Sequence, residues 1–253
     1  GVRRAALGVD RPVLKRFYKL ATVEARGGGD HGILLDGRQM RTPEKRPFAV
    51  PSAQLAAAIA AEWNAQGQDI GDPIALATMP LTRITNSIID GVAARREETA
   101  RDIMAFSRSD LICYRAASPQ ALVSLQAAAW DPICAWALHH FGTAPAVTIG
   151  IMPITQPEAL SEAITLDLAS RNAFEIGALH VLVTLSGSAL LALAIAAHQL
   201  SPADAWHRAL VDEDWQISQW GEDAEAMARR TVRRAEFMAA AMVLDTAHVQ
   251  GPA

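Results

Sequence analysis

The amino-acid sequence predicts an α+β protein in which a small N-terminal antiparallel sheet with helices is followed by an all-helical C-terminal domain. Short β-patterned segments and hairpin turns occur only before Ser52, and helical periodicity with recognisable caps follows. The chain has 253 residues, 51% of them hydrophobic, which is enough to bury a sizeable core. We place the boundary near Gly91 and predict domains over residues 1–92 and 93–253.

The predicted sheet is built from three short segments. Residues 17–25 alternate roughly between apolar and polar side chains, which is typical of a strand. A glycine-rich turn then leads to a second strand at 33–35. Asp36-Gly37 is a hairpin turn signal, and residues 48–50 form a further strand.

Two helices complete the predicted N-terminal domain. Ser52 has the residue type and position of a helix N-cap, and the helix runs to Gln66. Its inner stripe consists of Leu55, Ile59, Glu62 and Trp63. A shorter helix covers residues 81–90 and ends at Gly91.

The rest of the chain has helical periodicity interrupted by short loops. Ser118-Pro119 marks the start of one helix. We expect Trp130-Asp131-Pro132 to interrupt it, because a proline inside a helix removes a backbone donor. A fresh helix would then run to Phe141. The remaining predicted helices cover residues 92–106, 157–170, 172–199 (one or two pieces), 201–220 and 222–244, with a loop over 150–156.

Charge and cysteine content exclude several classes of partner and site. Residues up to Val92 carry twelve Lys and Arg against nine Asp and Glu, and the remainder carry eleven against eighteen. The excess of acidic residues after Val92 argues against nucleic acid as a partner. Cys113 and Cys134 provide no disulfide framework and no zinc-binding spacing, which fits a reducing compartment. We therefore predict no metal site and no cofactor.

One stretch, residues 176–199, has no charged side chain and is long enough to span a membrane. Ser186-Gly187-Ser188 interrupts it, however, and no basic cluster flanks it. We expect a buried helix or helix pair there and no membrane insertion. The opening residues, Gly1 to Arg4, are not followed by an apolar stretch, so we expect no secretory signal.

Glu213 is the most informative residue of the rear half. On a single helix over 201–220, it falls on the same face as four apolar residues, namely Trp206, Leu210, Ile217 and Trp220. An ionised carboxylate is expensive to bury without a partner. Either a partner protein supplies a group that pairs with this carboxylate, or an arginine among residues 229–234 pairs with a buried Glu213 as an internal strut.

A catalytic role for Glu213 is the third interpretation. The chain contains no phosphate-binding loop, no nucleophile elbow and no His-Glu-x-x-His motif, so we predict no catalytic residues. The alternative is a small-molecule hydrolase or lyase that uses Glu213 as acid or base, with its pKa raised by the apolar stripe.

Seven segments, in order along the chain, resemble the family of F1 ATP synthase assembly chaperones, the mitochondrial-type factor that binds the F1 alpha subunit. They are Lys15–Lys19, Leu35–Arg38 with Arg41–Pro43, Glu62–Gln66, Met79–Asn86, Asp110–Arg115, Trp130–Pro132, and Asp212–Gln216 with Trp220-Gly221. Each is weak alone, but seven in the family's order cover roughly residues 14–245.

The resemblance implies a two-domain protein without enzymatic activity that binds the free alpha subunit and shields its interface until it joins beta. It links a late helical glutamate to function, and Glu213 is the matching residue. With tryptophan as a preferred interface anchor, the candidate partner-binding residues are Glu213, Asp212, Trp215, Gln216, Trp220, Glu62 and Trp63.

No transit peptide rich in Arg and Ser precedes Lys15. The resemblance therefore points to a bacterial, cytoplasmic member, or to the mitochondrial matrix for a processed eukaryotic chain. We expect a monomer when the protein is free.

Overall fold

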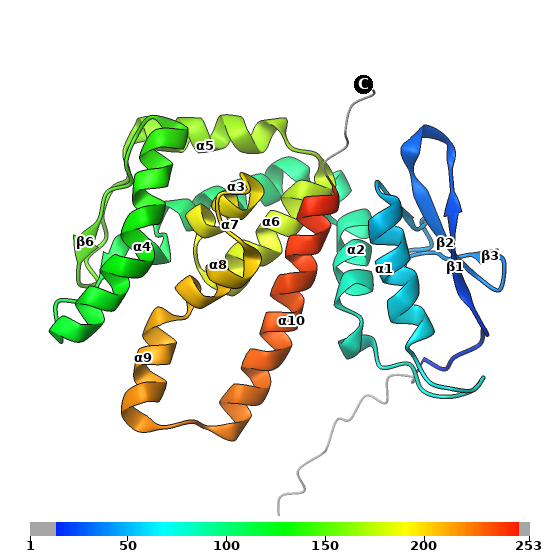
Figure 1. Ribbon diagram of the computed structural model, residues 1–253. Helices are drawn as coiled ribbons and strands as arrows, with labels where there is room; N and C mark the ends of the chain where they lie inside the picture. The colour runs from blue at the N-terminus through cyan, green and yellow to red at the C-terminus, as the bar shows by residue number, and fades with distance from the viewer. Residues whose placement is uncertain (1–13, 248–253) are drawn as a thin grey trace, which may run out of the picture.

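Four short strands near the start of the chain form one antiparallel sheet (Figure 1). The structure is a computed structural model that describes residues 14–247. The strands are β1 (Ala21–Ala25), β2 (His31–Leu35), β3 (Arg38–Gln39) and β4 (Ala49–Val50). Strand β2 is central, because it pairs with each of the other three.

The turn between β2 and β3 is the hairpin that the sequence predicted. Asp36 and Gly37 both have positive φ, at 48° and 78°, as a type I′ turn requires. The Asp36 carboxylate accepts hydrogen bonds from the backbone N–H groups of Lys19 and Leu20, which lower its pKa. Because these two N–H groups bond to a side chain, β1 begins at Ala21 and not at residue 17.

Helix α1 (Ala53–Asn64) covers one face of the sheet (Figure 1). The Ser52 side chain accepts a hydrogen bond from the Leu55 N–H at 3.2 Å, which confirms the predicted N-cap. Leu55 and Ile59 point into the sheet and are fully buried. Their burial fixes the helix on the strands.

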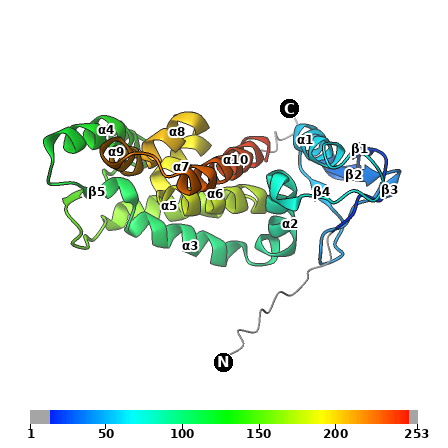
Figure 2. The same ribbon diagram turned by 90° about the horizontal axis from the view of Figure 1, so that it is seen from below.

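Helix α2 (Pro80–Asp90) lies between the sheet and the helical body (Figure 2). It packs on α1 at one side and on two long helices of the rear, α6 and α10, at the other. The close approach depends on Gly177 of α6, because a Cβ atom there would collide with the Ile88 side chain. The division into residues 1–92 and 93–253 stays a proposal, and α2 makes most of the contact between the two parts, with a smaller contribution from α1.

The rear of the chain is a helical body around the buried helix α6. Its helices are α3 (Arg96–Arg108), α4 (Gln120–Phe141), α5 (Glu158–Ser170), α6 (Ala173–Ser186), α7 (Ala189–Ala196), α8 (Pro202–Ala209), α9 (Val211–Trp220) and α10 (Ala224–Thr246). The predicted buried helix pair over 176–199 is confirmed as α6 and α7, separated by Gly187 in the left-handed conformation. The predicted fold class, a small sheet with helices followed by a helical region, is therefore confirmed.

Helix α4 continues through Pro132, where the sequence predicted a break, so that prediction was wrong. Pro132 has no N–H group, which deprives a carbonyl of the preceding turn of its usual donor. Arg208 of α8 donates to the nearby Ala129 carbonyl. The fully buried Trp130 in turn donates its indole N–H to the Arg208 carbonyl at 2.8 Å. Two hydrogen bonds to Arg208 of α8 thus hold the helical turn that precedes the proline.

The predicted helix over 201–220 is also corrected, because it is two helices that meet at Leu210. Leu210 has φ −106° and ψ 12°, outside the helical region, and its side chain is buried. This break turns α9 away from α8 and onto α4. A further difference is a two-residue parallel ladder between β5 (Tyr114–Arg115) and β6 (Thr148–Ile149), in a part of the chain where the sequence predicted helices and loops but no strand.

Within the described part of the chain, one helix, α4, satisfies the length and hydropathy expected of a membrane-crossing helix. Length and composition are the only properties of α4 that suggest a membrane-crossing helix. The segment that the sequence singled out, 176–199, is divided between two shorter helices. The opening residues Gly1 to Arg4, on which the expectation of no secretory signal rests, lie outside the described residues.

A fully buried carboxylate, Asp110, joins three segments of the helical body. It accepts hydrogen bonds from the N–H groups of Ile112, at 3.2 Å, and of Leu190 in the first turn of α7, at 2.9 Å. Burial raises the pKa of Asp110 to about 6, and the hydrogen bonds, including one from Ser188, oppose this shift. The side chain therefore organises a junction but is costly to keep ionised.

We predict that Asp110 makes stability fall as pH rises through about 4 to 6. The folded-state pKa lies above the ordinary value of 3.8, so the folded protein binds the extra proton in this window. Relative to Asp110→Asn, the wild type should gain about 2–3 kcal/mol of unfolding free energy between pH 7 and pH 4. Urea unfolding of both proteins at several pH values measures this difference. A difference that does not change with pH would contradict the prediction.

Candidate partner-binding site

The predicted apolar stripe around Glu213 is divided by the break at Leu210. Trp206 and Leu210 are buried, whereas no residue of α9 is buried. Ile217 is half-buried, and Trp220 at the end of α9 is 88% exposed. Glu213 therefore does not lie on a buried apolar face, which corrects the sequence-based expectation.

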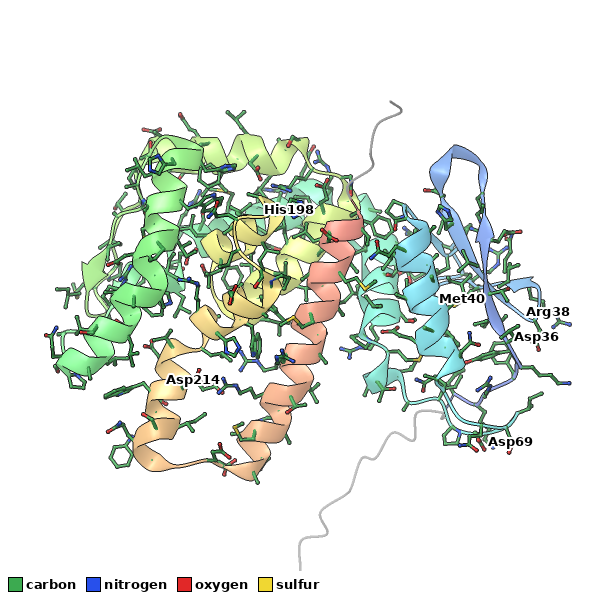
Figure 3. The ribbon with its side chains drawn as sticks, in the orientation of Figure 1. Asp36, Arg38, Met40, Asp69, His198 and Asp214 are labelled. Atoms are coloured by element: carbon green, nitrogen blue, oxygen red, sulfur yellow. The ribbon has the colours of Figure 1, made fainter. Side chains whose placement is uncertain are left out.

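Two arginines of α10 face the Glu213 carboxylate across the space between α9 and α10. The guanidinium nitrogens of Arg230 and Arg233 lie 3.8 Å and 3.7 Å from its oxygens, and the side chain is 36% exposed. Asp214, labelled in Figure 3, pairs more closely with Arg230, at 2.6 Å. The pairing expected of an internal strut is present, but the burial is not.

Arg230 and Arg233 are also positioned by other parts of the protein. Arg233 donates to the Leu185 carbonyl at 3.0 Å, and its guanidinium lies 5.8 Å from the centre of the Trp206 ring. The Arg230 side chain is 16% exposed. Glu213 and Asp214 thus lie opposite two positive charges of α10, and these ion pairs connect two helices that share few other contacts.

The other predicted residues of α9 point in different directions. Asp212 accepts a hydrogen bond from the Gln126 side chain of α4 at 2.7 Å, which fixes the start of α9 on α4. Trp215 is half-buried and Gln216 is exposed. The structure therefore brings Glu213 towards α10 and Asp212 towards α4, and leaves Gln216 and Trp220 in solvent.

Glu62 and Trp63, the two predicted contact residues of the N-terminal domain, have structural positions. The Glu62 carboxylate accepts hydrogen bonds from the N–H groups of Leu81 and Thr82 and from the Thr82 hydroxyl, each at 2.8 Å. Burial nevertheless raises its pKa. Trp63 is buried against the Tyr18 ring, with centroids 5.6 Å apart. We therefore remove both residues from the candidate site.

The surroundings of Glu213 do not suit acid–base catalysis. A general acid of the predicted kind needs a carboxyl group in an apolar pocket, whereas Glu213 faces two guanidinium groups and solvent. Among residues 14–247, no group of three or more His, Cys, Asp or Glu side chains is arranged to hold a metal ion.

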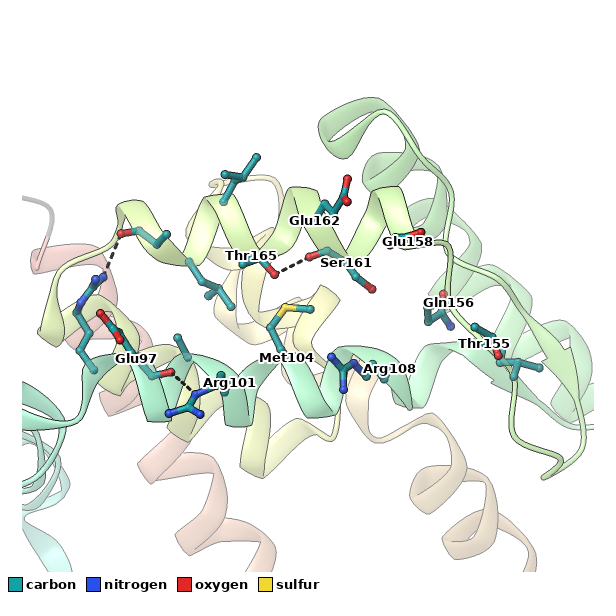
Figure 4. A pocket seen from close by; sticks show the side chains of 16 residues that line it. Glu97, Arg101, Met104, Arg108, Thr155, Gln156, Glu158, Ser161, Glu162 and Thr165 are labelled. Carbon is teal, nitrogen blue, oxygen red and sulfur yellow. Dashed lines mark hydrogen bonds between the residues drawn. The ribbon is translucent and has the colours of Figure 1, made fainter.

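The surface of the helical body has two hollows that the sequence did not predict. The larger, of about 1250 Å³, lies between α3 and α5 (Figure 4), and Met104 and Leu168 are among the residues that line it. The smaller, of about 650 Å³, lies between α10 and the α7–α8 turn, and Gln54 of α1 reaches its edge. Helices distant in sequence line both, so no local pattern could have indicated them.

Comparisons with known proteins agree over most of the chain. A family model described as ATP12 chaperone protein matches residues 15–138. The crystal structure of the Agrobacterium tumefaciens protein Atu1473 is similar at TM-score 0.86 and 41% identity, covering 93% of this chain and 87% of that one. Atp12 from Paracoccus denitrificans is similar at TM-score 0.83 and 35% identity, covering 92% and 98%. A mutant of the Paracoccus protein gives the same TM-score at 34% identity.

We predict that Glu62→Ala destabilises the protein by about 1–3 kcal/mol, because two N–H groups at the start of α2 and one hydroxyl lose their acceptor. Chemical denaturation measures the effect. Glu44→Ala, in an exposed turn, is the matched control and should stay within about 0.5 kcal/mol of the wild type. Equal stability of the two variants would show that Glu62 does not anchor α2.

Proposed function

We propose a function from one premise: the chain belongs to the ATP12 chaperone family. As a family member it is a chaperone of ATP synthase assembly. We propose further that its client is the free alpha subunit of F1, and that it covers the alpha surface later buried against beta. An unassembled subunit exposes apolar interface area, which is an aggregation hazard that such a cover removes.

The observation that best supports this proposal is the exposure of α9. This helix has no buried residue, yet it carries Trp220 in solvent and Trp215 half-buried beside Gln216. An exposed tryptophan adds nothing to the packing inside a folded domain, whereas a binding surface uses it as an anchor. We therefore propose that α9 contacts the client.

The charges around Glu213 support reversible binding. Its two arginine contacts, at 3.7 and 3.8 Å, are longer than hydrogen bonds, and its carboxylate is partly open to solvent. A basic group or a backbone N–H of the client can therefore bind the carboxylate without first breaking a strong internal bond. Because neither binding nor release breaks a strong bond inside the chaperone, the client can leave again when beta replaces the chaperone.

We also propose that the protein is not an enzyme, needs no cofactor, works in the bacterial cytoplasm without inserting into the membrane, and is monomeric when free. The family membership supports the first of these points. The arginine-lined surroundings of Glu213 support it as well, since they disfavour the hydrolase or lyase alternative.

Co-expression with the F1 alpha subunit of the same organism tests the function. We expect a soluble complex of one chaperone and one alpha subunit on size-exclusion chromatography with light scattering. An alpha subunit that stays insoluble, or elutes apart from the chaperone, in every condition would overturn the proposal.

We predict that Glu213→Lys weakens the alpha complex at least about ten-fold while the unfolding free energy changes by about 1 kcal/mol or less. The new cation opposes Arg230 and Arg233 in solvent-screened surroundings, so the cost to folding is small. Titration calorimetry and thermal unfolding measure the two effects, with the exposed Glu44→Lys as control. A large loss of stability would instead identify Glu213 as an internal strut.

We predict that Trp220→Ala costs about 2 kcal/mol of client affinity and leaves the melting temperature unchanged, because the side chain is 88% exposed. Ile70→Ala, which truncates an exposed apolar residue of the N-terminal half, controls for general loss of apolar surface. Equal affinities of the two variants would exclude Trp220 as an anchor.

A further inference from the structure

The segment between α4 and α5 exposes an unusual amount of apolar surface. No charged residue occurs from Phe141 to Pro157. Within it, Ile149 is 70% and Ile151 is 93% exposed, and Val147 and Met152 are exposed as well. Single exposed apolar residues are common, but a cluster of this size marks an interaction surface.

Strand β6 in this segment also has a free edge. Among the described residues it pairs only with β5, in parallel register with Arg115 opposite Ile149. The Gly150 N–H donates to the Arg115 carbonyl at 2.8 Å. Because alternate residues of a parallel strand point their backbone groups to opposite sides, the N–H and C=O of Ile149 face away from β5.

Folded proteins normally protect such an edge with lysine, with an inward charge or with a covering loop. This edge has no charged residue, and its side chains stay exposed. The prolines at 145 and 153 only bound it at the two ends. An unprotected edge is a template for another extended chain.

We propose that residues 147–152 form a second docking site, where an extended, uncharged segment of the client adds to β6 as a strand. The inference rests on the proposed function for the identity of the client. The charge distribution supports this occupant. Residues 93–253 carry eighteen acidic against eleven basic residues, yet the edge of β6 has no charged residue. A neutral apolar strand therefore matches this edge. Lipid offers no backbone groups to pair with the edge.

The position of the edge fits the same client as α9. Arg115 of β5 pairs with Asp131 of α4 at 2.8 Å, and α9 packs on α4 as well. The two surfaces therefore flank one helix, as Figure 1 shows. Ile154, two residues beyond Met152, lines the groove between α3 and α5, so the segment that carries the edge also borders this groove.

Two substitutions at Ile149 test the edge. Ile149→Pro removes an N–H that does not belong to the β5 ladder, and Ile149→Lys places a charge on the edge while keeping the N–H. We expect each to weaken the alpha complex about ten-fold at unchanged melting temperature. Ile70→Lys, a comparably exposed site in the N-terminal half, is the control. Unchanged affinity of both Ile149 variants would overturn the inference, even if Glu213→Lys abolishes the complex.

Hydrogen exchange measured by NMR gives a direct readout that separates this inference from the proposed function. We expect the amides of Ile149 and Ile151 to exchange more slowly when the alpha subunit is bound. If the alpha subunit does not bind at all, a capped eight-residue peptide of alternating Val and Thr is the probe, and it should protect the same amides. Absence of protection with both probes overturns the strand site. Concentration-dependent dimerisation that Ile149→Pro abolishes would also overturn it, because the occupant would then be a second copy.

Discussion

The capping of helix α2 by Glu62 is the interaction on which the arrangement of the two halves depends. The first turn of a helix leaves backbone N–H groups without partners, and at α2 a carboxylate from α1 supplies the acceptor. This bond fixes α2 against α1, and α2 in turn makes most of the contact between the sheet half and α6 and α10, to which α1 adds a smaller contact with α10. Asp110 plays the same part inside the helical body, where it joins the end of α3 to the start of α7.

Local signals in the sequence predicted most of the elements. The Asp36-Gly37 turn, the Ser52 cap and the Gly187 break depend on the conformation of one or two residues, so they could be recognised without tertiary information. The exceptions depend on distant partners. Helix α4 continues through Pro132 next to a turn that is held by hydrogen bonds with Arg208 of α8, and nothing near residue 132 in the sequence indicates these bonds.

The candidate site shows the same division. Some residues of the candidate site could be predicted, because an acid among aromatic residues suggested a functional surface. An arginine partner for Glu213 among residues 229–234 was one of the predicted alternatives. The break at Leu210 could not be predicted in this way, and it separates Glu213, which lies beside solvent, from the buried residues of α8. The capping role of Glu62 could not be predicted, because a glutamate next to a tryptophan has the same local pattern whether it meets a client or caps a helix of its own chain.

The contact between Gly177 and Ile88 has a consequence for how this protein can change in evolution. A side chain at position 177 would push α2 away from α6, and the displacement would be transmitted to the sheet through α1. A substitution at 177 is therefore tolerable only together with a smaller residue at 88, so the two positions should vary as a pair. Such paired variation would preserve the spacing of the two halves through lineages whose surfaces diverge.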